Sequence, residues 1–235
     1  MPRPSRNLDR ALLAAGRELF AARGCAGLTV REVVDAAGVN LGMFHYHFKS
    51  REAFLRAVLQ SVYEEMYTQL TVVAQRREDL ASPTLQLRAT LRFMGRFVRV
   101  NRPVLARVLA DALCGEAIAQ EFIRANFPRH LGIVRGLIAH AQQAGEMRAL
   151  AVPQVMGFCV GSLAMPILVV GAAIDSGALD RGLATGLDAS LLSDAALDER
   201  IDLALAALAV PRAPAKAARP PPKTAPRARS PKGPA

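Results

Sequence analysis

The apolar residues near the start of the chain repeat at the spacing of an amphipathic helix. From Leu8 to Phe20 they recur every three or four positions, which places them on one face of a helix. Asn7 stands before this run and Gly24 after it. The pattern therefore predicts a first helix that is capped by Asn7 and ended by Gly24.

Two short helices are predicted next. Thr29 and Glu32 have the Thr-x-x-Glu spacing of a capping box, and Gly38 ends the helix that this box begins. Asn40 can cap the helix that follows only two residues later. Two short helices across a tight glycine turn are typical of a helix-turn-helix.

The aromatic residues of the second short helix predict which side of it is buried. Phe44 and Phe48 lie four residues apart and therefore share one face. Ser50 can cap a fourth helix, whose apolar residues extend to about Leu70. The first 66 residues are thus predicted to form a helix, a helix-turn-helix and a long, partly buried helix.

The pattern stays helical from Pro83 to about Leu208. Residues 176–193 contain three glycines and predict a loop or an irregular helix, and residues 194–208 predict a last amphipathic helix. The expected breaks between the other helices fall near residues 101–103, at Gly115, at residues 144–145 and at Pro153.

The net charge of +10 is divided unevenly along the chain. Residues 1–60 hold nine Lys or Arg against five Asp or Glu, residues 61–210 fourteen against fifteen, and residues 211–235 seven against none. A nearly neutral middle between basic ends predicts a packed central domain and ends that bind nucleic acid or acidic lipid. The proline-rich last segment has little to bury and predicts a disordered basic tail.

The three cysteines and the lack of catalytic motifs narrow the class of protein. Cys25, Cys114 and Cys159 are widely separated and odd in number, so we expect buried thiols rather than a disulfide framework or a zinc ribbon. The first ten residues lack the apolar core of a signal peptide, and we expect a cytoplasmic protein. The chain has no phosphate-binding loop, nucleophile elbow or zinc-protease motif. We therefore expect no enzymatic activity and no cofactor.

The second short helix carries the candidate chemistry. His45 and His47 could suggest a metal site, but residues two apart on a helix point about 200° away from each other. No carboxylate or cysteine nearby completes a ligand set. If Phe44 and Phe48 face inward, Tyr46 and part of the helix must be exposed. An exposed face of hydroxyl and imidazole groups followed by two cations suits phosphates and base edges of DNA.

The stretch from Leu28 to Leu55, LTVREVVDAAGVNLGMFHYHFKSREAFL, resembles the DNA-binding segment of the TetR/AcrR family of bacterial one-component transcriptional regulators. The resemblance covers roughly residues 6–66 and is much weaker beyond them. The positions that match the family's spacing are Phe20, Gly24, Thr29, Gly38, Val39, Gly42, Tyr46, Phe48, Lys49, Phe54 and Leu55.

The resemblance implies an all-α fold with an N-terminal three-helix DNA-binding domain and a larger C-terminal helical domain. It implies the helix-turn-helix domain at 6–66 and an effector-binding and dimerisation domain at 67–210, which lie between a basic arm at residues 1–5 and the basic tail at 211–235. The residues expected to contact DNA are Arg31, Leu41, Gly42, Met43, His45, Tyr46, His47, Lys49 and Arg51.

These residues have different implied roles. Lys49 and Arg51 would hold phosphates, and Arg31 would reach a base edge or a phosphate. His45, Tyr46 and His47 would contact mainly the DNA backbone, while Leu41, Gly42 and Met43 would face bases. Leu41 departs from the polar or basic residue that the family often has there, so readout at this point would be apolar, as of a thymine methyl group.

Residues 155–174 form twenty positions without a charge, which is long enough to cross a membrane. Pro166 within the segment and Asp175 directly after it argue against a span. The resemblance implies instead a homodimer through about Pro153–Ile174 and Asp194–Leu208, which places two recognition helices on a palindromic operator.

The resemblance also implies a pocket for a small, hydrophobic effector that releases the operator. Arg102 and His130 could supply polar anchors in it. Two alternatives are a membrane-associated basic helical protein and an architectural DNA-binding protein without an effector. The candidate pocket residues are Phe93, Phe97, Arg102, Leu105, Phe122, Phe127, His130 and Phe158.

Overall fold

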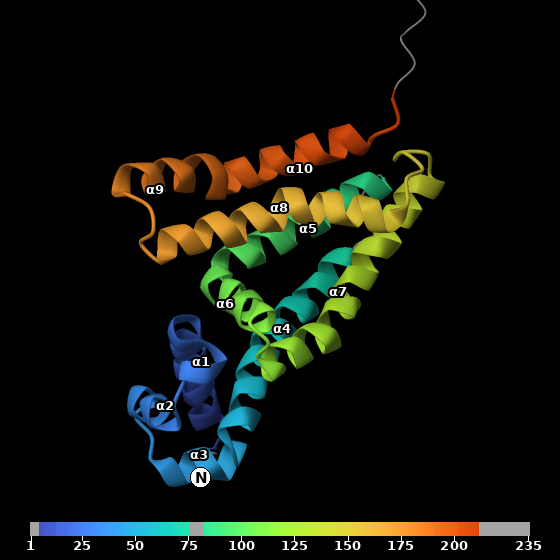
Figure 1. Cartoon of the computed structure of the whole chain (residues 1–235). Coiled ribbons are helices and arrows are strands. Elements are labelled where there is room, and N and C mark those ends of the chain that lie inside the picture. Colours follow the sequence, from blue (N-terminus) through green and yellow to red (C-terminus); the bar gives the residue numbers. More distant parts are fainter. Residues whose placement is uncertain (1–4, 76–81, 212–235) are drawn as a thin grey trace, which may run out of the picture.

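The computed structural model describes residues 5–75 and 82–211, and these ranges consist of helices joined by short connections (Figure 1). This confirms the predicted all-α class. The helices are α1 (Ser5–Gly27), α2 (Val30–Ala37), α3 (Leu41–Phe48), α4 (Arg51–Gln75), α5 (Pro83–Val100), α6 (Arg102–Leu113), α7 (Ala117–Gln143), α8 (Val152–Asp175), α9 (Arg181–Leu187) and α10 (Asp194–Leu208), with a π-helical segment at Asp188–Leu192.

The capping signals around the turn are confirmed. The Thr29 hydroxyl accepts from the Glu32 N–H at 3.3 Å, and a Glu32 carboxylate oxygen accepts from the Thr29 N–H at 3.2 Å. Gly38 ends α2 in the left-handed conformation, with φ 65°. The Asn40 side chain then accepts from the N–H of Met43 at 2.9 Å. Short-range side-chain caps therefore set the position of the turn.

The start of α1 differs from the prediction. The helix begins at Ser5 and includes Asn7, so Asn7 is not its cap. At the other end Gly24 does break the helix, with φ 68° and ψ −169°, before a short helical turn continues to Gly27. That backbone conformation is accessible almost only to glycine.

Aromatic side chains fill the core of the N-terminal domain. Phe20, Phe44 and Phe54 are fully buried, and the rings of Phe44 and Phe54 lie 5.1 Å apart. Phe48 is half-buried, with its ring 4.9 Å from that of Phe54. The predicted inward face of α3 is thus held against the start of α4.

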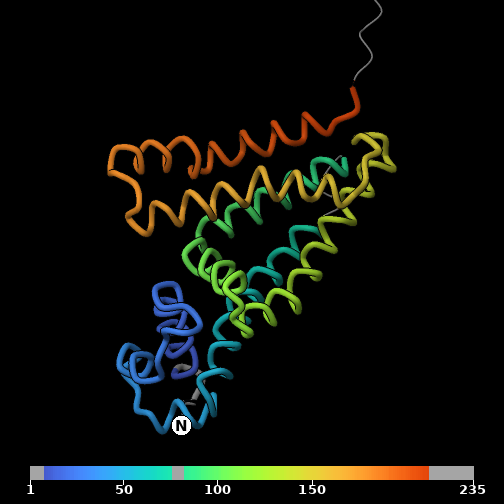
Figure 2. The backbone as a smooth tube through the Cα atoms, viewed as in Figure 1, coloured from blue at the N-terminus to red at the C-terminus, as the bar shows by residue number. Residues whose placement is uncertain are grey.

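The long helix α4 leaves this domain and enters the rest of the molecule (Figure 2). It continues without a break through residue 66, where the sequence placed the domain boundary. Helices α5 and α7 pack against α4, and α8 and α10 lie at the end of the molecule farthest from α3 (Figure 1). Residues 1–4 of the predicted arm and 212–235 of the predicted tail lie outside the described residues.

Helices α5 and α10 are joined by arginine–aspartate pairs. Arg88 binds Asp202 at 2.5 Å, and Arg92 binds Asp198 at 2.6 Å. Just beyond the Arg92–Asp198 pair the helices come close at Gly95, where the Leu197 side chain packs onto the bare backbone. The irregular helix that the sequence allowed at 176–193 is present as α9 and the π-helical segment.

Gly95→Ala should lower the free energy of unfolding by about 1–3 kcal/mol, the usual cost of adding a methyl group to a packed core. A Cβ at this position would lie 2.7 Å from Leu197 Cδ1. Urea denaturation measures the loss. Gly136→Ala is the matched control because a Cβ at that helical position meets no atom within 4 Å. Equal stability of the two variants would contradict the close packing of α10 on α5.

Helix α8 is long and apolar enough to cross a membrane by length and composition. Its buried residues include Val155, Cys159, Leu163 and Ile167, which join the largest core cluster together with residues of α5, α7 and α10. One face of the uncharged segment is therefore part of the helical core. Among the cysteines, Cys25 and Cys159 are buried as predicted, whereas Cys114 is exposed.

Candidate nucleic-acid interface

Helix α3 has one buried and one exposed side. Phe44 is fully buried, whereas Tyr46 is 75% exposed and Leu41 is 52% exposed. The cap at Asn40 and the turn at Gly38 orient α3 so that these two side chains reach solvent at the end of the molecule. The predicted DNA-contacting residues that are exposed are Arg31, Leu41, Gly42, His45, Tyr46 and Lys49, and Met43 is half-buried.

Arg51 does not join this exposed set. Its Nε donates to the Leu28 carbonyl at 2.6 Å, and one terminal nitrogen, Nη2, donates to the carbonyls of Cys25 and Ala26. The side chain thus fastens the start of α4 to the loop between α1 and α2. This geometry gives Arg51 a structural role in place of the predicted phosphate contact.

His47 also points toward the protein. Its Nδ1 lies 3.9 Å from a carboxylate oxygen of Asp9, and the side chain is only 11% exposed. The Nδ1 of His45 instead lies 3.4 Å from the Lys49 carbonyl oxygen. The two imidazoles therefore face different partners, as the helical spacing predicted. Lys49 itself has a positive φ of 59° at the end of α3.

A polar junction that sequence reasoning missed links α6 to the end of α1. Arg107 donates to the Arg23 carbonyl at 3.0 Å and to Asp111 at 2.9 Å. The second Asp111 oxygen accepts from the Cys25 N–H at 2.6 Å. Burial and the neighbouring Asp111 raise the pKa of the Cys25 thiol to about 12. The Gly24 backbone lies directly against the Arg107 guanidinium group, so a glycine is required at the centre of this junction.

A second link joins the middle of α1 to the rest of the molecule. Arg17 binds Glu65 on α4 at 3.2 Å and also donates to the side chain of Asn101, the buried residue between α5 and α6.

In the junction between α6 and α1, the spacing Arg107-x-x-x-Asp111 was visible in the sequence as an i, i+4 ion pair. Its partners on α1 are distant in sequence, and no local signal identifies them.

The predicted effector residues are not gathered in one pocket. Phe93, Phe97 and Phe122 pack together in a small core cluster with Tyr63. Burial lowers the pKa of His130, whose ring lies 5.8 Å from that of Tyr63 and 5.2 Å from that of Phe127.

The other predicted pocket residues lie elsewhere. Arg102 binds Asp175 at 2.8 Å and Asp188 at 3.6 Å, so it joins α6 to α8 instead of anchoring a ligand. Leu105 is half-buried on α6, and Phe158 on α8 is 46% exposed.

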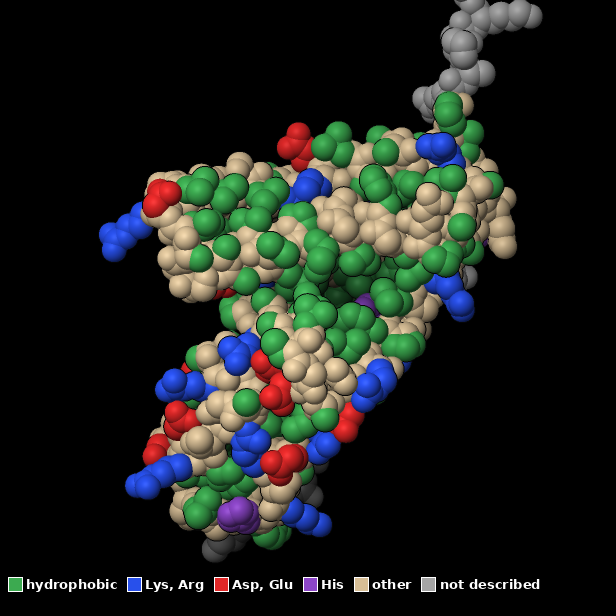
Figure 3. Space-filling view, viewed as in Figure 1, with side chains coloured by type: hydrophobic (Ala, Val, Ile, Leu, Met, Phe, Trp, Pro, Cys, Tyr) green, Lys and Arg blue, Asp and Glu red, His purple; other side chains and the backbone are tan. Residues whose placement is uncertain are grey.

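The hollows among the described residues include a small pocket and a larger cleft. A small apolar pocket of about 60 Å³ lies between α5, α7 and α8 and includes Met94, Met156 and Cys159. A larger open cleft of about 420 Å³ lies between α4 and α7 and includes Phe122. Figure 3 shows hydrophobic side chains gathered in a hollow below α8.

A family model described as bacterial regulatory proteins, tetR family, matches residues 12–58, which include α2 and α3. The HTH-type transcriptional repressor KstR2 of Rhodococcus jostii is 36% identical over 80 residues, which cover 34% of this chain and 36% of that repressor. The chain therefore spans about a third of the length of this curated relative.

Two other comparisons extend over most of the chain. The HTH-type transcriptional regulator TtgR of Pseudomonas putida is 27% identical over 196 residues, or 78% of this chain and 91% of that protein. The crystal structure of HlyIIR, a hemolysin II transcriptional regulator, has the same fold, with a TM-score of 0.58 and 16% identity over 88% of this chain and 99% of that chain. By this match, residues 12–58 of the chain form a DNA-binding domain of the TetR family of bacterial regulatory proteins.

Proposed function

We propose that this protein is a cytoplasmic DNA-binding repressor that binds a palindromic operator as a homodimer and is released by a small hydrophobic effector. The observation that carries the proposal is the outward face of α3, where Tyr46, Leu41 and Lys49 are exposed beyond a buried aromatic base. Residues 6–66 would bind DNA and residues 67–210 would bind the effector and the second copy. KstR2, which shares the N-terminal domain, is named as a repressor.

The dimer would form through α8 and α10. Val169 on α8 is 63% exposed and Leu203 on α10 is 64% exposed, and the face that these helices present in Figure 3 carries hydrophobic side chains and few charges. Contiguous apolar surface of this kind is typical of a protein interface. Two copies related by a two-fold axis would place two α3 helices on successive half-sites.

The effector would enter the apolar pocket between α5, α7 and α8. Leu91, Met94 and Leu163 line it together with other apolar side chains, so an uncharged hydrophobic molecule fits its chemistry. At about 60 Å³ the pocket is smaller than typical ligand sites, and binding requires these helices to separate. Such separation would change the distance between the two α3 helices of the dimer. It would release the operator only if the effector binds more tightly to the state that does not bind DNA.

Binding to DNA tests the proposal. With a duplex selected by the wild-type protein from a random pool, Tyr46→Ala should weaken binding about tenfold or more in a mobility-shift titration. Lys49→Ala should also reduce the salt dependence of the affinity by about 0.9 log unit per log unit of salt, because one phosphate contact is lost.

Arg135→Ala is the control, because it removes an exposed cation from α7 and should leave both quantities unchanged. All three variants should elute from a sizing column with the wild-type protein. Undiminished DNA binding by the Tyr46 and Lys49 variants would show that α3 does not form the interface.

A further inference from the structure

Three side-chain cross-links join α4 and α7 along the lower part of the molecule. On α4 they lie one helical turn apart, at positions i, i+4 and i+8, so they follow one face of that helix. The pairs are Arg56 with Glu121, Gln60 with Asn126, and Glu64 with Arg129.

The open cleft of about 420 Å³ lies between the first two cross-links. Ala57 on α4 and Ile118, Phe122 and Ala125 on α7 supply apolar side chains to it. Because the side chains of Ala57 and Ala125 are small, they leave the space between α4 and α7 open. The two cross-links lie at its two ends. The volume is in the range of small-molecule sites, and the cleft is separate from the apolar pocket between α5, α7 and α8.

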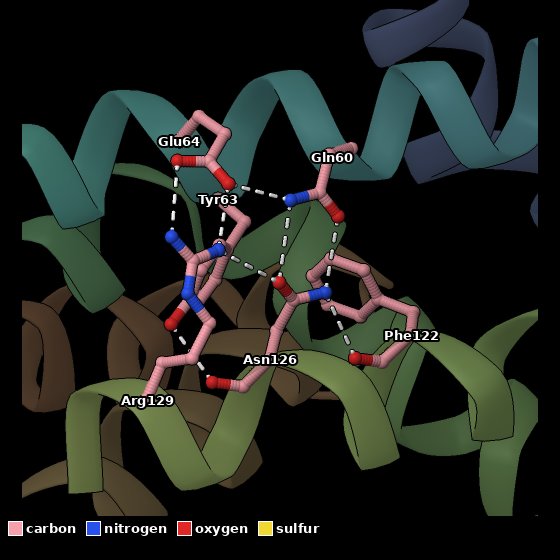
Figure 4. Close-up of polar contacts among 6 residues, drawn as sticks. All are labelled: Gln60, Tyr63, Glu64, Phe122, Asn126 and Arg129. Carbon is pink, nitrogen blue, oxygen red and sulfur yellow. Dashed lines mark hydrogen bonds and ion pairs between the residues drawn. The ribbon is translucent and has the colours of Figure 1, made fainter. Parts of the chain in front are cut away.

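The amide end of the cleft is fixed in place. Asn126 Nδ2 donates to Gln60 Oε1 at 3.1 Å and to the Phe122 carbonyl at 3.0 Å, and the Tyr63 hydroxyl donates to the Asn126 carbonyl at 2.8 Å. Figure 4 shows these groups facing one another between the two helices. Arg129 extends the network by donating to Glu64 at 2.6 Å, and Glu64 in turn accepts from Gln60. The cleft therefore has a preformed wall that needs no ligand to order it.

The charged end is held less firmly. Both Nε and a terminal nitrogen of Arg56 bind the same oxygen of Glu121, at 3.0 and 2.9 Å. The two side chains are 51% and 46% exposed, and exposed ion pairs contribute little to stability. A carboxylate that approached in the guanidinium plane could use both of its oxygens, which is the stronger geometry for arginine. Arg56 can therefore exchange Glu121 for a second carboxylate.

We propose that this cleft binds a small monocarboxylic acid with an apolar body. The carboxylate binds Arg56, and the body lies on Ala57, Ile118 and Phe122 against the amide wall. Among the residues that line the cleft, Arg56 supplies the positive charge for an anion. This site is additional to the proposed effector pocket, and its existence does not depend on DNA binding.

Titration calorimetry with 1-naphthoate on the full chain tests the proposal. We expect one site per chain, and about tenfold or greater weakening with methyl 1-naphthoate, which cannot form the charged pair. Arg56→Gln should weaken 1-naphthoate binding to the same extent. Ala125→Phe should abolish binding because the added ring occupies the cleft. Arg124→Gln, which removes an exposed cation beside the cleft residues on α7, should bind as the wild type does.

Thermal melting confirms that the variants are folded, which is expected because Arg56 and Ala125 are exposed. Equal binding of 1-naphthoate by the wild type, Arg56→Gln and Ala125→Phe would overturn the proposal and place the ligand elsewhere, as in the pocket between α5, α7 and α8. Absence of binding at about 10 mM, where even a millimolar site is filled, would overturn it as well.

Discussion

Gly24→Ala should lower the free energy of unfolding by about 2–4 kcal/mol, because two separate costs coincide at this position. The backbone there has φ 68° and ψ −169°, a conformation that costs any residue with a Cβ about 1–3 kcal/mol. The added methyl group would also overlap the Arg107 guanidinium group. Arg107 would then lose its hydrogen bonds to the Arg23 carbonyl and to Asp111.

Chemical denaturation of three variants separates the two costs. Gly27→Ala is the matched control, because Gly27 has no positive φ and a Cβ there meets its nearest atom at 3.4 Å. The double variant Gly24→Ala with Arg107→Ala removes the overlap and keeps the backbone strain. If Gly24→Ala is as stable as Gly27→Ala, the junction between α1 and α6 does not have the described geometry.

The same substitution should also affect operator binding if the proposed function is correct. Arg107 and Asp111 connect α6 to the end of α1 through Arg23 and Cys25. A loosened junction would allow the N-terminal domain to change its orientation relative to α5–α10. The two α3 helices of a dimer would then have the spacing of the two half-sites less often. The affinity for the operator, measured by mobility shift, should therefore fall by more than the loss of folded protein explains.

The helix-turn-helix could be predicted from the sequence because its determinants are local. The Thr29–Glu32 capping box, the left-handed Gly38 and the Asn40 cap each involve residues no more than four positions apart. A pattern of residue types at such spacing contains the whole interaction. The buried side of α3 was predicted for the same reason, since four-residue spacing alone places Phe44 and Phe48 on one face.

The roles of individual charged residues could not be predicted in this way. Arg51 binds the carbonyls of Cys25, Ala26 and Leu28, and Arg102 binds Asp175 and Asp188. Because the guanidinium group can pair with a phosphate, a carbonyl or a carboxylate, its partner depends on which group the fold brings near. Residue type therefore suggested DNA and effector contacts where tertiary packing supplies internal partners.

The positions of the cavities between helices could not be predicted from the sequence either. Phe93 and Phe97 have the residue type of a pocket lining but lie in a packed cluster with Tyr63. The open cleft instead lies beside Ala57 and Ala125, small residues that no pattern of large apolar side chains would select. Cavities depend on the distance between helices, and side-chain type along one helix does not determine that distance.

Phe44→Ala should lower the free energy of unfolding by about 3–5 kcal/mol, the usual cost of removing a buried phenyl group. The ring is fully buried and lies 5.8 Å from that of Phe48 and 5.1 Å from that of Phe54, so its loss leaves a cavity under the whole of α3.

Paired measurements of urea unfolding and DNA binding distinguish this support from direct contact with DNA. Phe44→Leu is the conservative control and should cost less than about 1.5 kcal/mol, because it keeps most of the apolar volume. Tyr46→Ala should change stability by no more than about 0.5 kcal/mol, since Tyr46 is 75% exposed, and yet weaken DNA binding. Phe44→Ala should reduce both quantities. A Phe44→Ala protein as stable as the wild type would mean that α3 is held by other contacts, and the orientation proposed for its exposed face would then lose its basis.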